Sequence, residues 1–504
     1  MYQKQSALYA AVHNIFWRFG HQILSLVKHI MIASYIGLSS QLDIFYMALA
    51  IFGVLITSWA IVFDVLAIPK FVRLQVEKKF FEFNKLCMSL LIFTFIISIL
   101  YTIIFFFFSD FISNFAIGFS KEKKLLLQES FLWLLPAIAF YLPYFALCSI
   151  LKSLRLFSII NIIEFFSTLI IVITLFIFIK VQFVLYWSYS VSIIFSFLCA
   201  LFYISGKIPI NFINPFNKVF KKLLPSIPPL LLIHSSFYIF ALTDRFFVTF
   251  LQVGDISALT YATVIVFLTP QILGISSFFL TTYAEEKDIS KKSIKLNDTI
   301  SFTFLISIPL ISILLIAGES IIFILLERGE FTKEDTLRVQ EIIYALSFII
   351  IPIIIQSAID QIFQVEEKFI YIVTFKIFGL FLNVLFNYIF IFIFNLGVLG
   401  AALATTVSYW FILILSIWNI KKVSLSITLL GHFKWVSWLL LFNLPILFLN
   451  KISIFYSLNS YFKLIMILSA SAILMSLCIL FFFGPEKKLI IRSIRKIKDI
   501  VFNG

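Results

Sequence analysis

Charged residues are scarce in this sequence, and their scarcity excludes a water-soluble protein. Only 13% of the 504 residues are charged, while 62% are hydrophobic. A soluble domain is about a quarter charged and about half apolar, so this chain could not cover an apolar core with a polar surface. We therefore expect a membrane protein.

Motifs for metal binding, disulfides and catalysis are also missing. The cysteines lie in or at the edges of apolar runs, with no CxxC pair and no Cys/His metal spacing; they are Cys87, Cys148, Cys199 and Cys478. There is no Walker loop, no nucleophile elbow and no paired acid and base in a long loop. We predict a protein that is not an enzyme, with no metal site, no cofactor and no ATP-driven pumping.

Long apolar runs dominate the chain, and they predict an all-α polytopic membrane protein. A run of about 20 apolar residues is long enough for a helix to cross a hydrocarbon core of about 30 Å. The runs are continuous and not alternating, so they indicate helices and not barrel strands. We predict 14 transmembrane spans, at 11–36, 44–68, 86–108, 130–151, 157–179, 183–204, 229–253, 263–283, 300–326, 338–363, 370–394, 397–419, 432–449 and 462–483.

The net charge of +14 does not indicate a nucleic-acid partner, because the cations cluster in short loops between the spans. Lys and Arg are dense in 70–85, 207–222, 287–295 and the tail 487–498, while loops 1–2, 7–8 and 11–12 have none. Cytoplasmic loops of membrane proteins carry the excess of Lys and Arg. This alternation predicts a multi-pass protein with both termini in the cytoplasm.

Two hairpins six spans apart resemble each other and suggest a duplication. Residues 35–52 and 247–267 both run from an apolar helix through a short polar turn into an aromatic-rich helix. Duplication of an even number of spans gives parallel halves, with the substrate at the interface of the halves. We predict two six-helix halves, 1–206 and 207–420, followed by two extra spans and a basic tail in 421–504.

The first predicted span carries cations that hydrocarbon would not tolerate. Its polar residues recur at three or four positions and form one stripe of a helix: Asn14, Arg18, His21, Gln22, Ser25, Lys28 and His29. An Arg or Lys at mid-bilayer costs about 2.5–3.5 kcal/mol on insertion scales. One interpretation is that these side chains snorkel to the interface. The other is a hydrated cavity that binds an anion, since Arg and Lys both bind phosphate.

Further charges fall within other predicted spans, and their roles stay open at this point. They can form interhelical ion pairs, such as Asp360 with Lys376, or they can line the polar cavity. Arg245 is a candidate fifth cation of the cavity. The acids are candidates either for coupling to Na⁺ or H⁺ or for structural pairing, and they are Asp64, Glu164, Asp244 and Asp360.

Four segments resemble the MurJ/MviN-type lipid II flippases of the MOP exporter superfamily. They are the first hairpin, the seventh hairpin, the loop before span 10 with Phe331 and Thr332, and the entry to span 12, at 32–55, 243–263, 325–347 and 395–410. The order of these segments and the count of 14 spans also match. The resemblance covers about residues 8–420.

The resemblance implies a transporter of the bacterial inner membrane. Its substrate would be an undecaprenyl-diphosphate-linked saccharide, lipid II or a relative, moved from the cytoplasmic to the outer leaflet by alternating access. It implies a cavity whose basic residues hold the diphosphate, and a groove for the lipid tail formed by the last two spans. The resemblance also implies contact with membrane lipid and suggests cell-wall synthesis enzymes as partners.

The cavity residues depart from the family pattern. Of the paired arginines expected in the first span, only Lys28 falls at a matching position, with His29 where an acid is expected. Leu55 and Ile56 occupy the place of a basic residue in span 2, and Tyr261–Val264 does so in span 8. A Wzx-type exporter of another lipid-linked oligosaccharide therefore stays open. A MATE-type cation-coupled exporter and a scaffold whose charges are paired are the remaining alternatives.

Overall fold

The structure is a computed structural model that describes residues 7–208, 218–221, 223–273, 283, 288–427 and 460–481. Within these residues every regular element is a helix. Ten helical stretches are long and apolar enough to cross a membrane: Ser40–Val76, Phe80–Phe107, Lys121–Ser153, Phe157–Phe178, Val184–Ser205, Leu224–Val248, Ile289–Leu325, Lys333–Val365, Phe369–Ile393 and Gly397–Val423. The prediction of an all-α polytopic membrane protein is confirmed.

Three further helices lie where spans were predicted: α1 (Ala7–Ile36), α11 (Asp255–Leu273) and α21 (Ser460–Phe481). The predicted span 432–449 lies outside the described residues. The total of 14 spans therefore stays a prediction.

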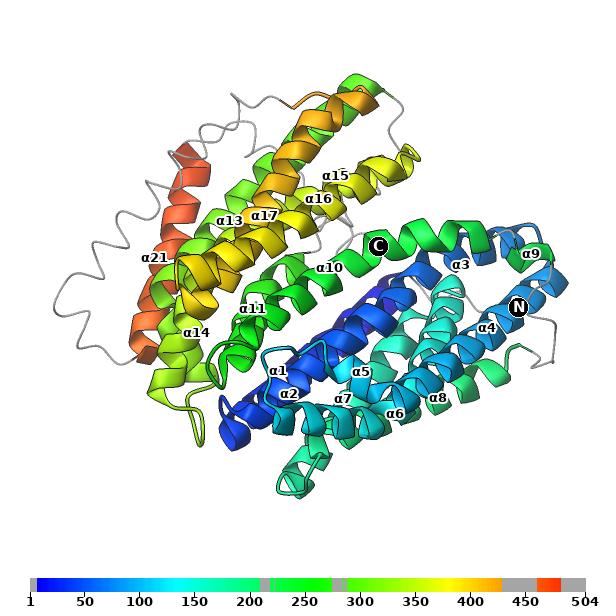
Figure 1. The fold of residues 1–504 in the computed structure, drawn as a ribbon. Helices are drawn as coiled ribbons and strands as arrows, with labels where there is room; N and C mark the ends of the chain where they lie inside the picture. The colour runs from blue at the N-terminus through cyan, green and yellow to red at the C-terminus, as the bar shows by residue number, and fades with distance from the viewer. Residues whose placement is uncertain are drawn as a thin grey trace. The chain divides into compact units, whose positions relative to one another are not determined.

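By its internal contacts the chain divides into two compact units, Met1–Ile256 and Ser257–Gly504. In the first unit α6 (Lys121–Ser153) is the central helix (Figure 1). Ser120 caps its N-terminus by accepting a hydrogen bond from the Lys123 N–H at 3.3 Å. The helices that pack against α6 are α2 (Ser40–Phe52), α3 (Ser58–Val76), α4 (Phe80–Phe107), α5 (Ser109–Ser113), α7 (Phe157–Phe178) and α8 (Val184–Ser205).

Helix α1 lies along α7 at one side of this unit (Figure 1). The Trp17 ring meets the Phe165 ring edge to face, with their centroids 5.2 Å apart. A Cβ atom at Gly20 would come 3.1 Å from the Phe165 ring, so glycine allows the two helices to approach closely here. This packing fixes which face of α1 is turned toward α7.

A π-helical turn at Gly53–Thr57 joins α2 to α3, and α10 (Ile227–Val248) packs against this turn. A Cβ atom at Gly53 would lie 2.8 Å from Cδ1 of Tyr238 on α10, which explains a glycine in the interior of a membrane helix. Ile56, in the same turn, is fully buried. The turn is therefore apolar at the place where the resemblance noted in the sequence predicts a basic residue.

Two segments of the first unit form hydrogen bonds with the residues that follow α10. The buried Asp43 carboxylate, in the first turn of α2, accepts a hydrogen bond from the Gly254 N–H at 2.7 Å. The Gly118 N–H, in the loop before α6, donates to Oγ1 of Thr249 at 3.0 Å. The two hairpins compared in the sequence thus touch through Asp43 and Gly254.

The second unit is built around α13 and α17. Helix α13 (Ile289–Leu325) packs against α14 (Lys333–Leu346), α15 (Ile350–Val365) and α21. Helix α17 (Gly397–Asn419) packs against α14, α15 and α16 (Phe369–Tyr388). Helix α14 begins with a capping box, in which Thr332 and Asp335 each accept a hydrogen bond from the other's backbone N–H.

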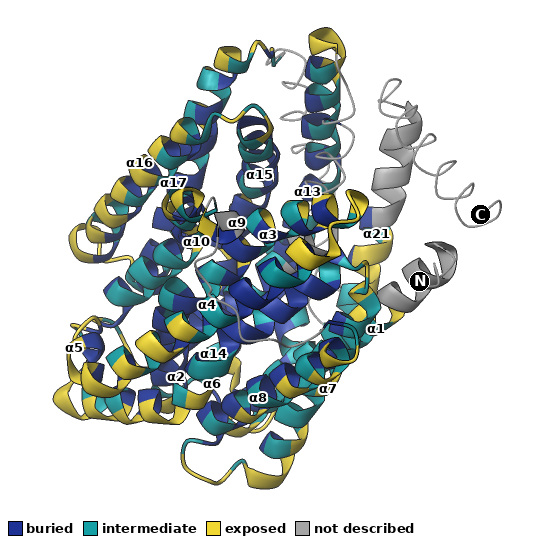
Figure 2. Cartoon of the chain, turned by 90° about the vertical axis from the view of Figure 1, so that its right-hand side faces the viewer, coloured by how far each residue is buried: buried dark blue, intermediate teal, exposed yellow. Residues whose placement is uncertain are grey.

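Exposed positions on these helices are mostly apolar, as a lipid-facing surface requires. Figure 2 shows exposed residues along α16, and they include Ile370, Ile377, Phe381 and Tyr388. Isolated large apolar patches of this kind on a soluble protein would cause aggregation. In a membrane protein they are the surface that faces the acyl chains.

Candidate functional site on the first helix

The polar stripe of α1 does not face one uniform environment. Arg18 is exposed, His21 and Lys28 are half-buried, and Ile32 and Ala33 at the C-terminal end are buried. Ten residues separate Arg18 from Lys28, which corresponds to about 15 Å along a helix. Two cations therefore stand at different depths of the same helix.

His21 is anchored to α7. Its Nδ1 lies 3.1 Å from Oγ1 of Thr168 and 3.2 Å from the backbone oxygen of Glu164. These contacts place the imidazole between α1 and α7, where it joins the two helices. The sequence assigned His21 to the cavity stripe, and the structure gives its Nδ1 partners on α7.

Lys28 is the cation of α1 whose surroundings most favour the binding of a ligand. It is half-buried, and in the described parts of the chain its ammonium forms neither a hydrogen bond nor an ion pair. A desolvated charge without a partner is costly, so Lys28 is the first candidate on α1 for contact with a charged substrate. His29, next to it in α1, is also half-buried.

Arg245 lies near the end of α10, and one of its donors is already used. Nη1 donates to the backbone oxygen of Ala241 at 2.9 Å, one turn earlier in the same helix. Asp244, its neighbour in sequence, is buried with 6% of its surface exposed. Arg245 is therefore partly held by its own helix, whereas Lys28 has no comparable contact.

Asp64 is a structural acid in the first unit. Its carboxylate forms an ion pair with Lys152 of α6 and accepts a hydrogen bond from Oγ of Ser149 at 2.6 Å. The sequence placed Lys152 in the turn after span 4, but α6 continues through Ser153. This extension by two residues keeps Lys152 on α6, where it pairs with Asp64.

Asp360 forms the ion pair that the sequence suggested. Its Oδ2 lies 2.9 Å from Nζ of Lys376, and each side chain is 13% exposed. Nε2 of Gln356 donates a second hydrogen bond to Oδ1 at 2.7 Å. The interhelical pairing of Asp360 with Lys376 is confirmed, and it connects α15 with α16.

Glu164 differs from these two acids. It lies in α7, is half-buried, and its backbone oxygen is the partner of His21. Within the described residues its carboxylate forms no hydrogen bond and no ion pair. The first unit thus holds an unpaired cation, Lys28, and an unpaired acid, Glu164, on neighbouring helices.

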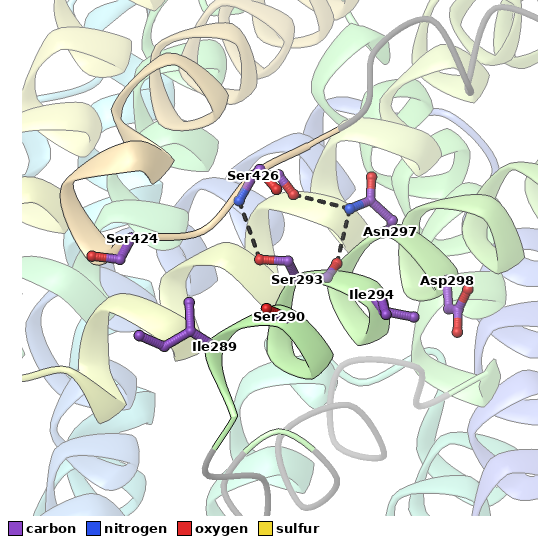
Figure 3. A pocket seen from close by; sticks show the side chains of 8 residues that line it. All are labelled: Ile289, Ser290, Ser293, Ile294, Asn297, Asp298, Ser424 and Ser426. Carbon is purple, nitrogen blue, oxygen red and sulfur yellow. Dashed lines mark hydrogen bonds between the residues drawn. The ribbon is translucent and has the colours of Figure 1, made fainter.

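A separate pocket of about 460 Å³ lies in the second unit and does not fit an anionic substrate (Figure 3). Its lining is mostly hydroxyl, amide and apolar groups with one acid, from Ile289, Ser290, Ser293, Ile294, Asn297, Asp298, Ser424 and Ser426. Several polar groups already bond to one another, since Nδ2 of Asn297 donates to the Ser426 oxygen at 2.9 Å. No cation lines this pocket, in contrast to α1.

The described residues also offer no site for a metal. Among them no group of three or more His, Cys, Asp and Glu side chains could hold a metal ion. Cys87, Cys148 and Cys199 are free thiols, and the side chain of Cys478 lies outside the described residues.

Comparison with known proteins identifies the family. A family model described as "Lipid II flippase MurJ" matches residues 32–483. The chain belongs to the MurJ lipid II flippase family. Individual MurJ relatives share part of their sequence with this chain. A probable lipid II flippase MurJ of Aquifex aeolicus is 29% identical over 168 residues, which is 33% of each chain.

A second relative, the probable lipid II flippase MurJ of Buchnera aphidicola subsp. Schizaphis graminum, is 26% identical over 244 residues. That match covers 46% of this chain and 47% of the relative. The chain thus matches between a third and about half of the length of these MurJ relatives.

Solved structures agree with the family at the level of the fold. A lipid II flippase MurJ in an inward closed conformation has a TM-score of 0.78 at 21% identity, over 97% of this chain and 100% of the other. An inward-facing multidrug resistance MATE family transporter of the MOP superfamily has a TM-score of 0.69 at 15% identity, over 82% and 98%. The chain therefore shares its fold with these two transporters.

Proposed function

We propose that the protein moves an undecaprenyl-diphosphate-linked saccharide, lipid II or a relative, from the cytoplasmic to the outer leaflet by alternating access. It acts as a transporter and not as an enzyme. Membership of the MurJ family supports this function, and the MOP fold supports the mode of transport. The finer architecture belongs to the same proposal: 14 spans, two six-helix halves at 1–206 and 207–420, two extra spans in 421–504, and both termini in the cytoplasm.

The main support for the proposal is the environment of Lys28. Its ammonium on α1 is half-buried and has no counterion among the described residues. A diphosphate supplies the missing negative charge through charge-assisted hydrogen bonds. Arg18 on the same helix, and Arg245 and His29, are further candidate ligands of the diphosphate. His21 acts from the contact with α7, where it holds α1 in place.

The test follows the lipid that accumulates when the protein is depleted. We expect the undecaprenyl-diphosphate-linked precursor to build up in the cytoplasmic leaflet, and wild-type protein to restore its export. Lys28→Gln should fail to restore growth and export, and Lys28→Arg should restore them in part, because Arg keeps the charge. Lys421→Gln, an exposed lysine after α17, is the matched control and should restore export fully.

Two outcomes would contradict this assignment. Normal export with Lys28→Gln, at wild-type protein levels in the membrane, would remove Lys28 from the substrate site. Accumulation of a different lipid-linked oligosaccharide would favour the Wzx-type alternative, which uses the same phosphate chemistry. Cell-wall synthesis enzymes remain proposed partners, to be sought by crosslinking in the same strain.

A further inference from the structure

Glu164 lies seven residues into α7, in the middle of a set of helices that already contains paired charges. The elements packed against α7 are α1, α6 and α8. Among the described residues Glu164 has no hydrogen bond to its carboxylate and no ion pair, although it is half-buried. Asp64 and Asp360, by contrast, each have a lysine and a neutral hydrogen-bond donor.

The groups around Glu164 attract its charge without touching it. Arg18 on α1 and Lys152 on α6 both interact electrostatically with the carboxylate. Lys152 is in contact with Asp64 instead, and Arg18 is exposed. The other titratable groups facing Glu164 are His21 on α1 and, on α6, Tyr141, Tyr144 and Cys148. Helix α8 carries no charged residue.

This arrangement makes the charge of Glu164 depend on small movements of the helices. An ionised carboxylate at membrane depth is costly without a partner, whereas a protonated one is much less so. If α1 or α6 shifts so that Arg18 or Lys152 reaches Glu164, the ionised form is stabilised. If they withdraw, the neutral form is favoured. Protonation and helix position are therefore coupled.

A proton fits this site better than a metal cation does. Hard cations require several oxygen ligands, and no group of three or more candidate side chains occurs among the described residues. The backbone oxygen of Glu164 is already the partner of His21. Two neighbouring cations would also repel a bound metal ion, while they do not prevent release of a proton.

We propose that Glu164 takes up and releases a proton during the transport cycle, so that a transmembrane pH difference helps to drive export. The inference rests on the proposed function and adds its energy source. A pH difference of one unit changes the equilibrium of a process coupled to one proton about tenfold. A carboxylate fixed by a lysine, such as Asp64, does not provide this coupling.

The experiment uses the full chain in proteoliposomes of fixed lipid composition, with the membrane potential clamped. Movement of a labelled undecaprenyl-diphosphate-linked saccharide is measured with and without an imposed pH difference. We expect wild type to respond several-fold, Glu164→Gln to move the lipid without responding, and Glu164→Asp to keep the response. Glu319→Gln, an exposed acid of α13, is the control and should behave as wild type.

Wild-type transport that ignores the pH difference, or a Glu164→Gln response equal to that of wild type, would overturn the proposal. A second readout does not depend on transport. Infrared spectra of the purified chain should show a protonated-carboxyl band that disappears as pH rises and is missing in Glu164→Gln. If no lipid moves at any pH, the proposed function fails, and the infrared result alone decides whether Glu164 exchanges a proton.

Discussion

At the residue scale, charges within the membrane helices divide into those that have a partner and those that do not. Asp64 and Asp360 each have a lysine on a neighbouring helix. Such pairs connect neighbouring helices, and removing one partner would leave the other charge buried without compensation. Lys28 and Glu164 have no such contact in the described residues, and we propose that each acquires a partner during transport.

The pairing of Asp360 with Lys376 gives a direct residue-scale prediction. Lys376→Met leaves a buried carboxylate without its cation and should lower the free energy of unfolding by about 3–5 kcal/mol. Replacing both residues, as in Asp360→Asn with Lys376→Gln, should recover much of that loss. Thermal unfolding in detergent measures both, and equal losses in the single and double variants would contradict the pair.

The sequence predicted some of the partners of these charged side chains and missed others, depending on how the helices pack. The pair of Asp360 and Lys376 was predictable, because the two opposite charges lie in adjacent predicted spans. The partner of Asp64 was missed, because Lys152 was placed in a turn and α6 extends further. Helical periodicity put His21 and Lys28 on one stripe, but only the packing of α1 on α7 separates the anchored His21 from the unpaired Lys28.

At the element scale, the loops at helix ends are held by close backbone contacts. A Cβ atom at Gly118 would lie 2.5 Å from the Thr249 carbonyl carbon, so the loop before α6 sits directly on the end of α10. The hydrogen bond from the Gly118 N–H to Oγ1 of Thr249 holds the same contact. These contacts position α10 within the first unit.

Gly118→Ala should therefore destabilise the protein. The added methyl group meets backbone atoms that cannot rotate away, and overpacking of this kind costs about 1–3 kcal/mol. Gly206→Ala is the matched control, because nothing lies within 4 Å of a Cβ atom there. Melting temperatures in detergent compare the two variants, and a Gly118→Ala protein as stable as Gly206→Ala would contradict the contact.

The turn between α15 and α16 provides a pH-dependent contact outside the membrane spans. Burial alone would raise the pKa of Glu366, but the hydrogen bonds that Lys292 and Tyr283 donate outweigh this effect and lower it. Both donors lie 3.0 Å from Oε1 of Glu366. The ionised carboxylate thus ties the start of α13 to the turn after α15.

A lowered pKa in the folded state means that the ionised form of Glu366 stabilises the protein at neutral pH. This stabilisation is complete well above the ordinary carboxyl value of 4.5 and is lost as pH falls through the folded value. Glu366→Gln should therefore melt below wild type at pH 7, and the difference should shrink below pH 4.5. A difference that stays constant with pH would show that the charge is not responsible.

At the scale of the whole molecule, the apolar composition predicts a helical membrane fold, and membership of the MurJ family supports the proposed function. The all-α fold followed from the length of the apolar runs alone. The substrate did not, since Leu55 and Ile56 replace a basic position of the family and only contacts can tell which cation is free. The account therefore depends on Lys28 as the group that binds the diphosphate.

The most direct test measures transbilayer movement of lipid II by the purified full chain in proteoliposomes. We expect movement by wild type and a loss of at least tenfold in Lys28→Gln, since a charge-assisted hydrogen bond contributes about 1.5–3 kcal/mol. Lys421→Gln should move the lipid at the wild-type rate. Movement by a correctly folded Lys28→Gln protein at the wild-type rate would contradict the account.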